Sequence, residues 1–389
     1  MNKNKKIFDF EYNDEEHVIE KFERNYPNNE KYAPFGLIKD DKIDKTQFNR
    51  WWKNRQIPAS RNGLKEILYK SNIYDKDHFD LLDSKAYCLS LSDQYWVKSV
   101  DENILWEDIN FFEHEFSEDI GKIFFDRNNN LSNLNLNTPD MTSNGNYEKR
   151  WKIINGDRYL LKAGSKMINQ EPFNEVIATK LYERILNDDE YVKYSIVYEN
   201  DRAVSICKNF ITKETELIPA WKINEYYEFL DNENKYEHYI RCLNNLKIPN
   251  ANILVDKMII CDFILANKDR HFNNFGVIRN VETLEFEKVA PLFDNGCSLW
   301  FDENDMYVGE FFLTKPFEEY EKTQVSLVRN FEWFDIQKLE GFTNEVKEIL
   351  LNNKLLSQER IDKIIEQIKK RIEFINQLKQ SKETNNDNM

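Results

Sequence analysis

The stretch that decides the fold class is DFILANKDRHFNNFG, residues 262–276. Apolar residues before it, such as Leu254 and Met258, repeat at helical spacing, so a helix is expected to lead into a polar loop. The loop holds Asp269 and, five residues later, Asn274. Phosphoryl transfer needs a carboxylate beside the attacking hydroxyl and oxygen ligands that hold Mg²⁺ against the phosphates. Asp269 and Asn274 suit these two tasks, and they equally suit a surface loop in which Asp, Asn and Gly only form turns.

A second candidate loop is APLFDNGCSL, residues 290–299, which places Asp294 25 residues after Asp269. An Asp at the end of an apolar run, followed by Gly, can present its carboxylate to a metal ion that bridges nucleotide phosphates. Asp-Asn-Gly is also a common hairpin turn. The order of the two loops, rather than either loop alone, favours the metal site.

A lysine and a glutamate upstream belong to the same candidate site. Lys162 ends the apolar run Tyr159-Leu160-Leu161, and Glu175 follows thirteen residues later in the first turns of a predicted helix. A lysine on a strand can neutralise phosphate charge when a glutamate from a helix holds it in place. Taken separately, both residues are more typical of solvated surface positions.

The segments around these residues predict small strands that alternate with a helix. Residues 151–154 and 159–162 flank Asn155-Gly156-Asp157-Arg158, which is a hairpin signal. Two further strands are expected at residues 194–198 and 203–207. The helix between the strand pairs carries Pro172 near its first turn and an apolar stripe of residues four apart, Phe173, Ile177, Leu181 and Ile185.

The two ends of the chain are predicted to be helical. Apolar residues around Trp51 and Trp52 recur at helical spacing, and this aromatic pair is expected to lie in a core rather than on a partner surface. Residues 361–375 carry isoleucines at a spacing close to that of a helix, and the polar chain from about Ser381 is expected to fray.

The chain therefore divides into three expected domains. Residues 1–125 form a mainly helical N-terminal module, residues 126–211 a small β-rich lobe that begins with an Asn-rich loop, and residues 212–389 a larger helical lobe. The expected fold class is α+β, with the chain order of a bilobal protein kinase preceded by a helical module. Such an order by itself does not assign a function.

Composition excludes several other classes. The chain has 389 residues, of which 41% are hydrophobic and 14% aromatic, so a disordered or coiled-coil protein is excluded. A net charge of −15 disfavours broad binding to nucleic acid or to anionic membranes. Five scattered cysteines are expected to be reduced thiols. With no signal sequence and no long apolar run, a cytoplasmic protein is expected.

The candidate residues together carry a resemblance to a known family. The Thr142-Ser143-Asn144-Gly145 turn, Lys162, Glu175, the loop from Asn267 to Asn274 and the Phe293-Asp294-Asn295-Gly296 turn occur in the order of HipA-like kinases, near the family's spacings. The chain resembles this family over about residues 138–320. The Asp-Arg-His-x-x-Asn form is also similar to the catalytic loop of phosphatidylinositol kinases.

The resemblance implies ATP and Mg²⁺ as cofactors and a role for each residue. Asp269 would be the catalytic aspartate, and His271 would brace its loop by hydrogen bonds rather than act as a base. Lys162 would bind the nucleotide phosphates, with Glu175 positioning it. The expected Mg²⁺ ligands are Asn274 and Asp294.

The resemblance also assigns the nucleotide loop and the hinge. Thr142, Ser143, Asn144 and Gly145 would cover the phosphates, and Lys208 to Phe210 would meet adenine through backbone groups. HipA-like kinases can modify a hydroxyl in this loop, so Thr142 or Ser143 is the expected site of autophosphorylation. A phosphate there adds roughly −1.5 to −2 charge and would repel ATP.

The expected function is ATP- and Mg²⁺-dependent phosphorylation of Ser or Thr in a protein substrate, extended by a toxin role in a bacterial toxin–antitoxin pair. The family's N-terminal region often contacts a small DNA-binding antitoxin, whereas residues 10–120 are more similar to the helical N-terminus of a compact branch. Membrane or direct nucleic-acid contacts are not expected. Two alternatives stay open, a lipid or small-molecule kinase and a pseudokinase that acts as a binding module.

Overall fold

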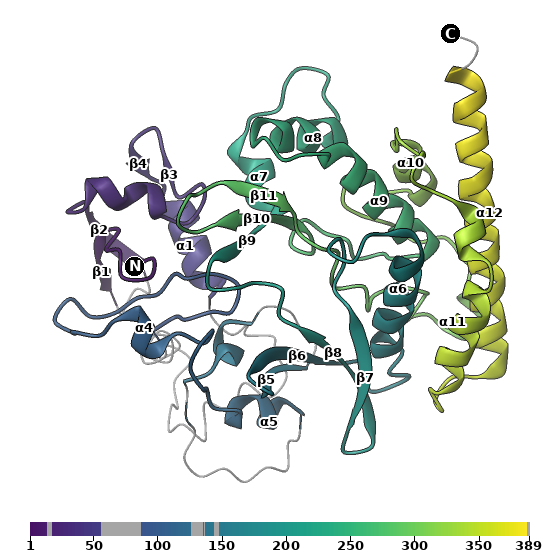
Figure 1. Ribbon diagram of the computed structural model, residues 1–389, viewed down its shortest axis with the longest axis horizontal. Coiled ribbons are helices and arrows are strands. Elements are labelled where there is room, and N and C mark those ends of the chain that lie inside the picture. Colours follow the sequence, from purple (N-terminus) through teal and green to yellow (C-terminus); the bar gives the residue numbers. More distant parts are fainter. Residues whose placement is uncertain (14–17, 56–86, 126–134, 136, 144–147, 387–389) are drawn as a thin grey trace. The chain divides into compact units, whose positions relative to one another are not determined.

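The described chain combines helices with small sheets, in agreement with the expected mixture of α and β structure. It folds into two compact units, and the chain passes between them several times. The expected domain boundaries after residues 125 and 211 stay a prediction. The computed structural model describes residues 1–13, 18–55, 87–125, 135, 137–143 and 148–386 (Figure 1). The first unit contains Met1–Lys162, Lys208–Leu217 and Arg279–Glu285, and the second contains Ala163–Cys207, Ile218–Ile278 and Phe286–Met389.

The first unit begins with strands, which the sequence analysis did not predict. Strand β1 (Asp9–Asn13) pairs antiparallel with β2 (Val18–Glu23), and β3 (Ile38–Lys39) pairs with β4 (Lys42–Ile43). Helix α1 (Lys45–Lys53) follows where helical spacing was expected. In its described part, the N-terminal module is therefore not mainly helical. The alternating residues of β1 are too few to stand out against the helical pattern of α1.

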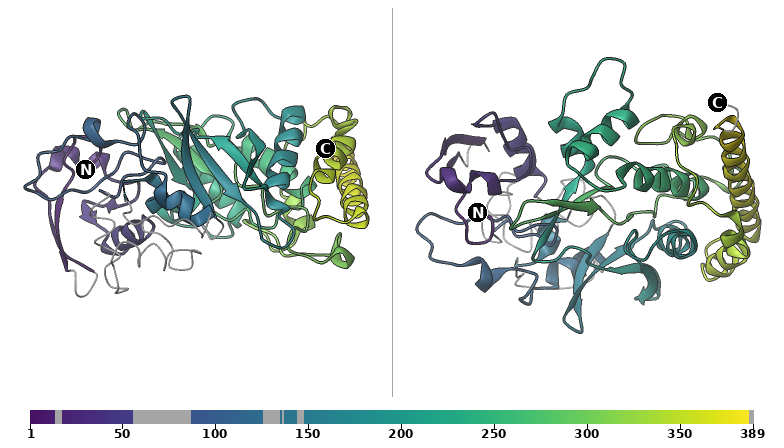
Figure 2. Two further views of the ribbon diagram at one scale, coloured as in Figure 1. Left: turned by 90° about the horizontal axis from the view of Figure 1, so that it is seen from below. Right: turned by 45° about the horizontal axis from the view of Figure 1, so that its top comes forward.

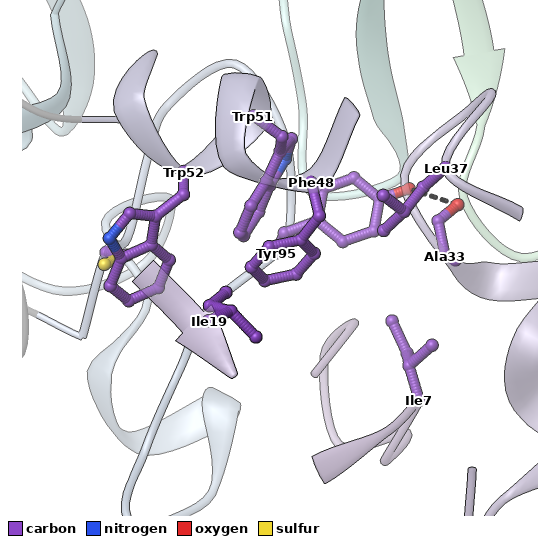
Figure 3. Packing of buried hydrophobic residues seen from close by; sticks show 9 residues of the cluster. Ile7, Ile19, Ala33, Leu37, Phe48, Trp51, Trp52 and Tyr95 are labelled. Carbon is purple, nitrogen blue, oxygen red and sulfur yellow. Dashed lines mark hydrogen bonds between the residues drawn. The ribbon is translucent and has the colours of Figure 1, made fainter. Parts of the chain in front are cut away.

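Helix α1 packs its aromatic face against these strands (Figure 3). Trp51 and Trp52 are only 9% and 7% exposed, which confirms that the pair belongs to a core. Trp52 lies edge-on to Phe10 with ring centroids 5.7 Å apart, and Phe48 lies edge-on to Phe22 at 5.0 Å. Edge-to-face aromatic pairs each add about 0.5–1.5 kcal/mol beyond the burial of their area.

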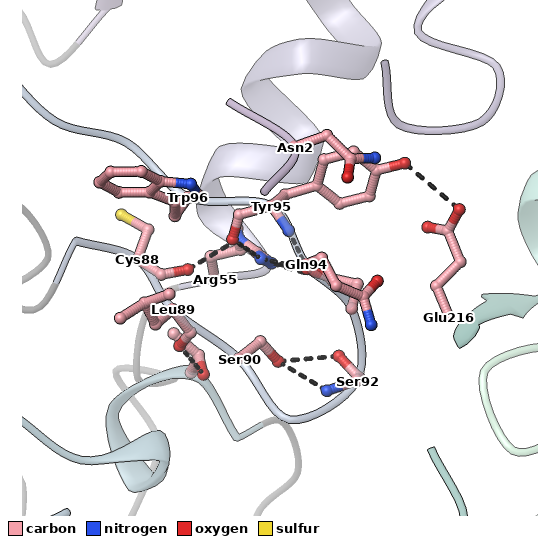
Figure 4. Close-up of polar contacts among 12 residues, drawn as sticks. Asn2, Arg55, Cys88, Leu89, Ser90, Ser92, Gln94, Tyr95, Trp96 and Glu216 are labelled. Carbon is pink, nitrogen blue, oxygen red and sulfur yellow. Dashed lines mark hydrogen bonds and ion pairs between the residues drawn. The ribbon is translucent and has the colours of Figure 1, made fainter. Parts of the chain in front are cut away.

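Polar contacts hold the segment after residue 86 against the end of α1 (Figure 4). The buried guanidinium of Arg55 donates from Nη1 to both carboxylate oxygens of Asp93, each at 3.0 Å. It also donates from Nε to the carbonyl of Cys88 at 3.2 Å and from Nη2 to the carbonyl of Tyr95 at 2.8 Å. The planar fork of an Arg fits such a set of oxygens better than a Lys would.

A buried polar triad links three distant segments of the first unit. The hydroxyl of Tyr95 donates to Glu216 Oε1 at 3.3 Å, and Arg279 donates from Nε to the same oxygen at 2.7 Å. Arg279 also donates from Nη2 to the Tyr95 hydroxyl at 3.1 Å. All three side chains are buried, so each one compensates the desolvation of the other two.

The predicted hairpin of the first unit is present. Strands β5 (Lys149–Ile154) and β6 (Asp157–Ala163) pair antiparallel. Their turn residues Asn155 and Gly156 have φ values of 52° and 85°, the left-handed conformation that a two-residue type I′ turn requires. This register places Lys162 near the end of β6, as expected.

Helix α6 (Glu171–Ile185) belongs to the second unit. Pro172 lies in its first turn, where the missing N–H of a proline has no cost. Strands β7 (Tyr194–Glu199) and β8 (Arg202–Lys208) form the next predicted hairpin. The predicted apolar stripe of the helix is buried, Phe173, Ile177, Leu181 and Ile185.

The middle of the chain surrounds the candidate catalytic loop. Almost all side chains of helix α9 (Ala251–Ile264) are buried, and such a helix is apolar on nearly all sides. The loop after α9 leads into Gly276, where a Cβ would lie 2.2 Å from the carbonyl oxygen of Ile218, so only glycine fits. Strands β9 (Thr215–Pro219), β10 (Gly276–Asn280) and β11 (Phe286–Val289) form a sheet in the order β11-β10-β9, and helices α7 (Ala220–Tyr226) and α8 (Lys235–Asn245) precede α9.

The C-terminal helices α11 (Phe342–Leu351) and α12 (Gln358–Asn386) lie side by side in each view (Figures 1 and 2). The isoleucines of the predicted stripe are buried in α12. Fraying from Ser381 is wrong, since the helix continues to Asn386. Lys382 explains the extension, because its Nζ donates to the carbonyls of Ser326 at 2.9 Å and Val328 at 2.5 Å.

Shorter elements complete the described chain, and all five cysteines are free. Among the helices of the described ranges, none has the length and apolar character needed to cross a membrane. The shorter elements are η1 (Pro27–Tyr32), α4 (Trp106–Ile109), α5 (Asp119–Phe125), η3 (Pro139–Thr142), η4 (Asp305–Tyr307), α10 (Glu321–Ser326) and η5 (Ile336–Leu339).

Candidate functional site

Helix α9 leads directly into the candidate catalytic loop, which runs from Leu265 to Phe275. The buried side chain of Asn267 fixes the start of this loop. Its Nδ2 donates to Asp262 Oδ1 at 2.9 Å, and its Oδ1 accepts the N–H of Asp269 at 3.0 Å. A side chain that binds backbone groups in this way substitutes for the partners that a helix end lacks.

The loop brings Asp269, His271 and Asn274 together. The side chains of Asp269 and His271 are 34% and 37% exposed, and His271 Nε2 lies 3.7 Å from Asp269 Oδ2. His271 Nδ1 accepts the N–H of Asn273 at 3.2 Å, so the imidazole braces the loop. Asn274 Nδ2 donates to the Asp269 carbonyl at 3.0 Å, which leaves the amide oxygen Oδ1 as the atom for a cation.

Asp294 lies in a strained turn of the second candidate loop. Its φ of 59° is in the left-handed region, which Asp tolerates better than most residues. Its N–H donates to the hydroxyl of Tyr194 at 3.4 Å. A non-glycine residue is held in this conformation only where its surroundings determine it, as is common at functional sites.

Arg270 joins the two loops. Its guanidinium is fully buried and donates from Nε and Nη2 to the two carboxylate oxygens of Asp262, each at 2.9 Å. Nη1 donates to the carbonyl of Asn274 at 2.8 Å and to that of Phe293 at 2.5 Å. Nη2 also donates to Asn295 Oδ1 at 2.5 Å. One side chain therefore connects helix α9, the candidate catalytic loop and both neighbours of Asp294, in the segment from Phe293 to Gly296 that is the candidate metal loop.

The guanidinium of Arg270 keeps its charge in this position. Burial alone would lower the pKa of Arg270, but the ion pair and hydrogen bonds with Asp262 outweigh burial and raise the pKa above its usual value. The link between the loops is therefore a charged one, as is usual for an Arg.

Helix α6 holds the metal loop from another direction. Glu175 Oε2 accepts the N–H of Asn295 at 2.8 Å, and the Tyr182 hydroxyl donates to Asn295 Oδ1 at 2.7 Å. Asn174 Nδ2 donates to the carbonyl of Gly296 at 2.8 Å. Glu175 therefore contacts the chain just after the metal-loop aspartate, a contact that the sequence analysis did not predict.

The two carboxylates of the site act on one half-buried thiol, that of Cys297. Burial raises the pKa of Cys297, and the charges of Asp294 and Asp269 raise it further. The two loops also meet at the backbone, where the N–H of Lys268 donates to the Cys297 carbonyl at 3.2 Å. The structure thus gathers Asp269, Asn274 and Asp294 in one region of the second unit.

The donor chemistry of this region fits Mg²⁺ bound with substrate phosphates. Asn274 Oδ1 and the Asp294 carboxylate are hard oxygen ligands, and Mg²⁺ usually takes one or two protein oxygens plus phosphates and water. Over the described ranges, no group of three or more His, Cys, Asp or Glu side chains could hold a metal ion. Phosphate and water oxygens would therefore supply the other positions.

The expected phosphate lysine and hinge residues lie in the first unit. Lys162 is half-buried near the end of β6, and Phe210 is half-buried just after β8. The Lys208 ammonium lies 2.8 Å from Asp157 Oδ2, and this hydrogen bond raises the pKa of Lys208. Any contact of Lys208 with adenine would therefore come from its backbone. The pairing of Lys162 with Glu175 stays a prediction.

The hydroxyls of the expected phosphate loop are engaged with the protein. Thr142 is buried, and its Oγ1 donates to the carbonyl of Leu89 at 2.9 Å. The Ser143 hydroxyl accepts the indole N–H of Trp151 at 3.0 Å. Two residues of the expected loop, Asn144 and Gly145, lie outside the described residues.

Sequence reasoning assigned no role to Arg270, Asn295 or Asp262. Arg270 lies inside the stretch that decided the fold class, directly beside Asp269. A useful signal was available, because an Arg next to a functional Asp must itself be neutralised when it is buried. Apart from Asp269 itself, the nearest carboxylate on the N-terminal side was Asp262, eight residues before Arg270 on the predicted helix.

Comparison with known proteins gives a partial relative among the serine/threonine kinases. The chain is similar to the serine/threonine-protein kinase CtkA of Helicobacter pylori, with 29% identity over 119 residues, which is 28% of this chain and 35% of that protein. The chain therefore spans about a third of the length of the curated relative that it matches.

A crystal structure of the proinflammatory kinase CtkA of Helicobacter pylori gives a TM-score of 0.45 at 17% identity, covering 57% of this chain and 89% of that chain. No protein-family model matches the chain.

Proposed function

We propose that the protein is an ATP- and Mg²⁺-dependent kinase of the HipA-like type that phosphorylates Ser or Thr in a protein substrate. The observation that carries the proposal is the buried Arg270, which ties the loop of Asp269 and Asn274 to the chain on both sides of Asp294. The partial similarity to a serine/threonine kinase agrees with it.

Asp269 is the proposed acceptor of the hydroxyl proton. The acceptor oxygen of Ser or Thr bonds to the γ-phosphorus, and the bond to the bridging oxygen breaks with its electron pair going to ADP. The hydroxyl proton passes to the Asp269 carboxylate late in a loose transition state. Asn274 Oδ1 and Asp294 would hold Mg²⁺, which neutralises charge on the phosphates when it is bound.

The nucleotide part of the proposal uses residues of both units. Lys162, held by Glu175, binds the phosphates, the loop from Thr142 to Gly145 covers them, and Lys208 to Phe210 form the hinge to adenine. A bilobal kinase arrangement is part of this proposal. Support comes from the hairpin and helix that carry Lys162 and Glu175 at the expected places.

A protein is the proposed acceptor because apolar side chains are exposed close to the site. Phe311, Leu313 and Tyr320 are each more than half exposed, and the rings of Phe311 and Tyr320 lie 5.4 Å apart. They flank Lys315, whose ammonium reaches Asp269. Exposed apolar clusters mark surfaces for other proteins more often than sites for small polar molecules. An antitoxin partner and a toxin role extend this proposal.

The test is phosphate transfer by the purified full chain. With γ-labelled ATP, Mg²⁺ and a mixed protein acceptor, label should appear on Ser or Thr of protein. Asp269→Asn should lower turnover roughly 10²- to 10⁴-fold, the range that a positioned proton acceptor supplies. Asp294→Asn should also remove most turnover, and excess Mg²⁺ should restore little because the variant lacks a charged ligand.

Asp362→Asn is the matched control, because Asp362 is an exposed carboxylate paired with Lys347 on the C-terminal helices. Its turnover should equal that of the wild type. Label on lipid or on a small molecule, with none on protein, would favour the alternative kinase classes. Nucleotide binding without any transfer would make the chain a pseudokinase and contradict the proposal.

A further inference from the structure

A cation from outside the catalytic loop reaches the proposed catalytic aspartate. Lys315 Nζ lies 2.9 Å from Asp269 Oδ1, and the two side chains are 51% and 34% exposed. Exposed ion pairs contribute little to stability, because water already solvates both charges. Stability therefore does not account for the contact, and its position at the reacting carboxylate suggests a role in the chemistry.

The backbone that carries Lys315 is held in place by a buried glutamine. Gln324 of helix α10 is buried, and its Oε1 accepts the N–H groups of Phe317 at 3.0 Å and Glu318 at 3.2 Å. Its Nε2 donates to the Lys315 carbonyl at 2.8 Å. Three backbone groups of the turn are thus bound by one side chain, so the base of the Lys315 side chain has a defined position.

The same turn is packed against the catalytic loop. Phe317 is buried and lies edge-on to Phe272 at 5.9 Å and to Phe275 at 6.3 Å between ring centroids. Tyr239 of helix α8 closes this cluster, with its ring 6.0 Å from that of Phe317. Phe272 and Phe275 belong to the loop of Asp269. The segments that carry Lys315 and Asp269 therefore pack against the same aromatic cluster.

The two oxygens of Asp269 have different neighbours. Oδ1 is in ion-pair contact with Lys315, whereas Oδ2 lies 3.7 Å from His271 Nε2, beyond hydrogen-bond distance. A carboxylate with one oxygen bound to an ammonium rotates less freely, so its second oxygen has a preferred direction.

We propose that Lys315 is a positioning residue of the kinase, which binds Asp269 Oδ1 and so directs Oδ2 toward the hydroxyl that is phosphorylated. This inference rests on the proposed function and adds a residue to it. When the hydroxyl oxygen bonds to the γ-phosphorus and ADP leaves, Oδ2 takes the hydroxyl proton. Lys315 keeps its own protons and acts only through Asp269.

The test compares Lys315→Met with Lys347→Met in the full chain. Lys347 is a similarly exposed lysine, paired with Asp362 at 3.2 Å, and it lies on helix α11. In Lys315→Met, kcat for phosphate transfer should fall about 10- to 100-fold while KM for ATP and the melting temperature stay unchanged. Lys347→Met should match the wild type, and Lys315→Arg should recover part of the loss because it restores the cation.

A double variant separates positioning from a structural effect. In single-turnover measurements, adding Lys315→Met to Asp269→Asn should cause no further loss, because a residue that acts through Asp269 has nothing left to position. An additive loss, a lower melting temperature without rescue by Arg, unchanged kcat or faster turnover would each overturn the inference. No transfer by the wild type would instead overturn the proposed function itself.

Discussion

At the scale of single residues, Arg270 is the side chain on which the arrangement of the candidate site depends most. It is buried with Asp262 as its counterion, and it donates to groups of the catalytic loop and of the metal loop. Such a residue need not touch substrate to matter, because the positions of two loops depend on its five N–H donors. Its loss should therefore affect stability and turnover together.

Arg270→Ala should lower the free energy of unfolding by about 3–5 kcal/mol, because Asp262 is left buried without a counterion. Phosphate transfer should be lost even where the variant remains folded, since both loops lose a common donor. Chemical denaturation and the transfer assay measure the two effects.

Arg329→Ala is the control for this variant. Arg329 is 62% exposed and pairs with Glu237 at 2.6 Å, so its removal should cost about 0–1 kcal/mol. If Arg270→Ala were as stable and as active as this control, the linking role of Arg270 would be wrong.

At the scale of elements, local sequence signals predicted the helices and hairpins that carry the site. Asn155-Gly156 fixed the turn of β5 and β6, and the spacing of isoleucines fixed α12, because each signal acts within a few residues. The short strands β1 to β4 were missed, and so were β9 to β11, which lie in the part expected to be a helical lobe. Their alternation extends over two to six residues, too few to be distinguished from noise.

The candidate site was predictable only where its contacts are local. Asp269 and Asn274 share one loop, so spacing in the sequence was enough to associate them. Glu175 and Asn295 are 120 residues apart, and Lys315 and Asp269 are 46 apart. No periodicity connects such pairs. Their contacts follow from tertiary packing, such as that of Phe317 on the catalytic loop.

The environments of Thr142 and Ser143, at the end of η3, favour one of these two hydroxyls as the site of the expected autophosphorylation. Both hydroxyls donate to backbone carbonyls, Ser143 to Pro139 at 3.1 Å and Thr142 to Leu89 at 2.9 Å. Ser143, which also accepts the Trp151 indole N–H, is half-buried, whereas Thr142 is buried and so less accessible to a phosphate donor. We expect mass spectrometry after incubation with ATP to find phosphate on Ser143 rather than Thr142. Trp151→Phe should increase the modification, because it removes the indole donor.

The modified protein should bind ATP more weakly, because a phosphate adds roughly −1.5 to −2 charge to the loop. Asp269→Asn serves as the control and should carry no phosphate. Phosphate confined to Thr142, or equal ATP binding by modified and unmodified protein, would contradict this prediction.

At the scale of the whole molecule, the chain does not form its two units one after the other. The first unit takes residues from three separate stretches, including Lys208–Leu217 and Arg279–Glu285. The triad of Tyr95, Glu216 and Arg279 joins all three stretches through buried charges. The N-terminal 125 residues are therefore structurally tied to strands β9 and β10.

Deleting residues 1–125 should destabilise the remaining chain. Tyr95 is removed from the triad, and the carbonyls of Thr212 and Thr215 lose the Gln94 amide that donates to them at 2.9 and 2.7 Å. Expression as a soluble protein and thermal unfolding measure the effect. Tyr95→Phe, which removes only a hydroxyl, should cost about 1–3 kcal/mol. A truncated chain that melts at the temperature of the full chain would refute this expectation.

The triad also bears on how such a protein can diverge. Recombination exchanges contiguous segments of a gene, and a new N-terminal segment without a tyrosine at position 95 would deprive the buried ion pair of Glu216 and Arg279 of its hydroxyl partner. Positions 95, 216 and 279 are therefore expected to vary as a set among related chains, even though 184 residues separate Tyr95 from Arg279. The N-terminal segment and strand β10, which follows the catalytic loop, are therefore expected to be inherited together.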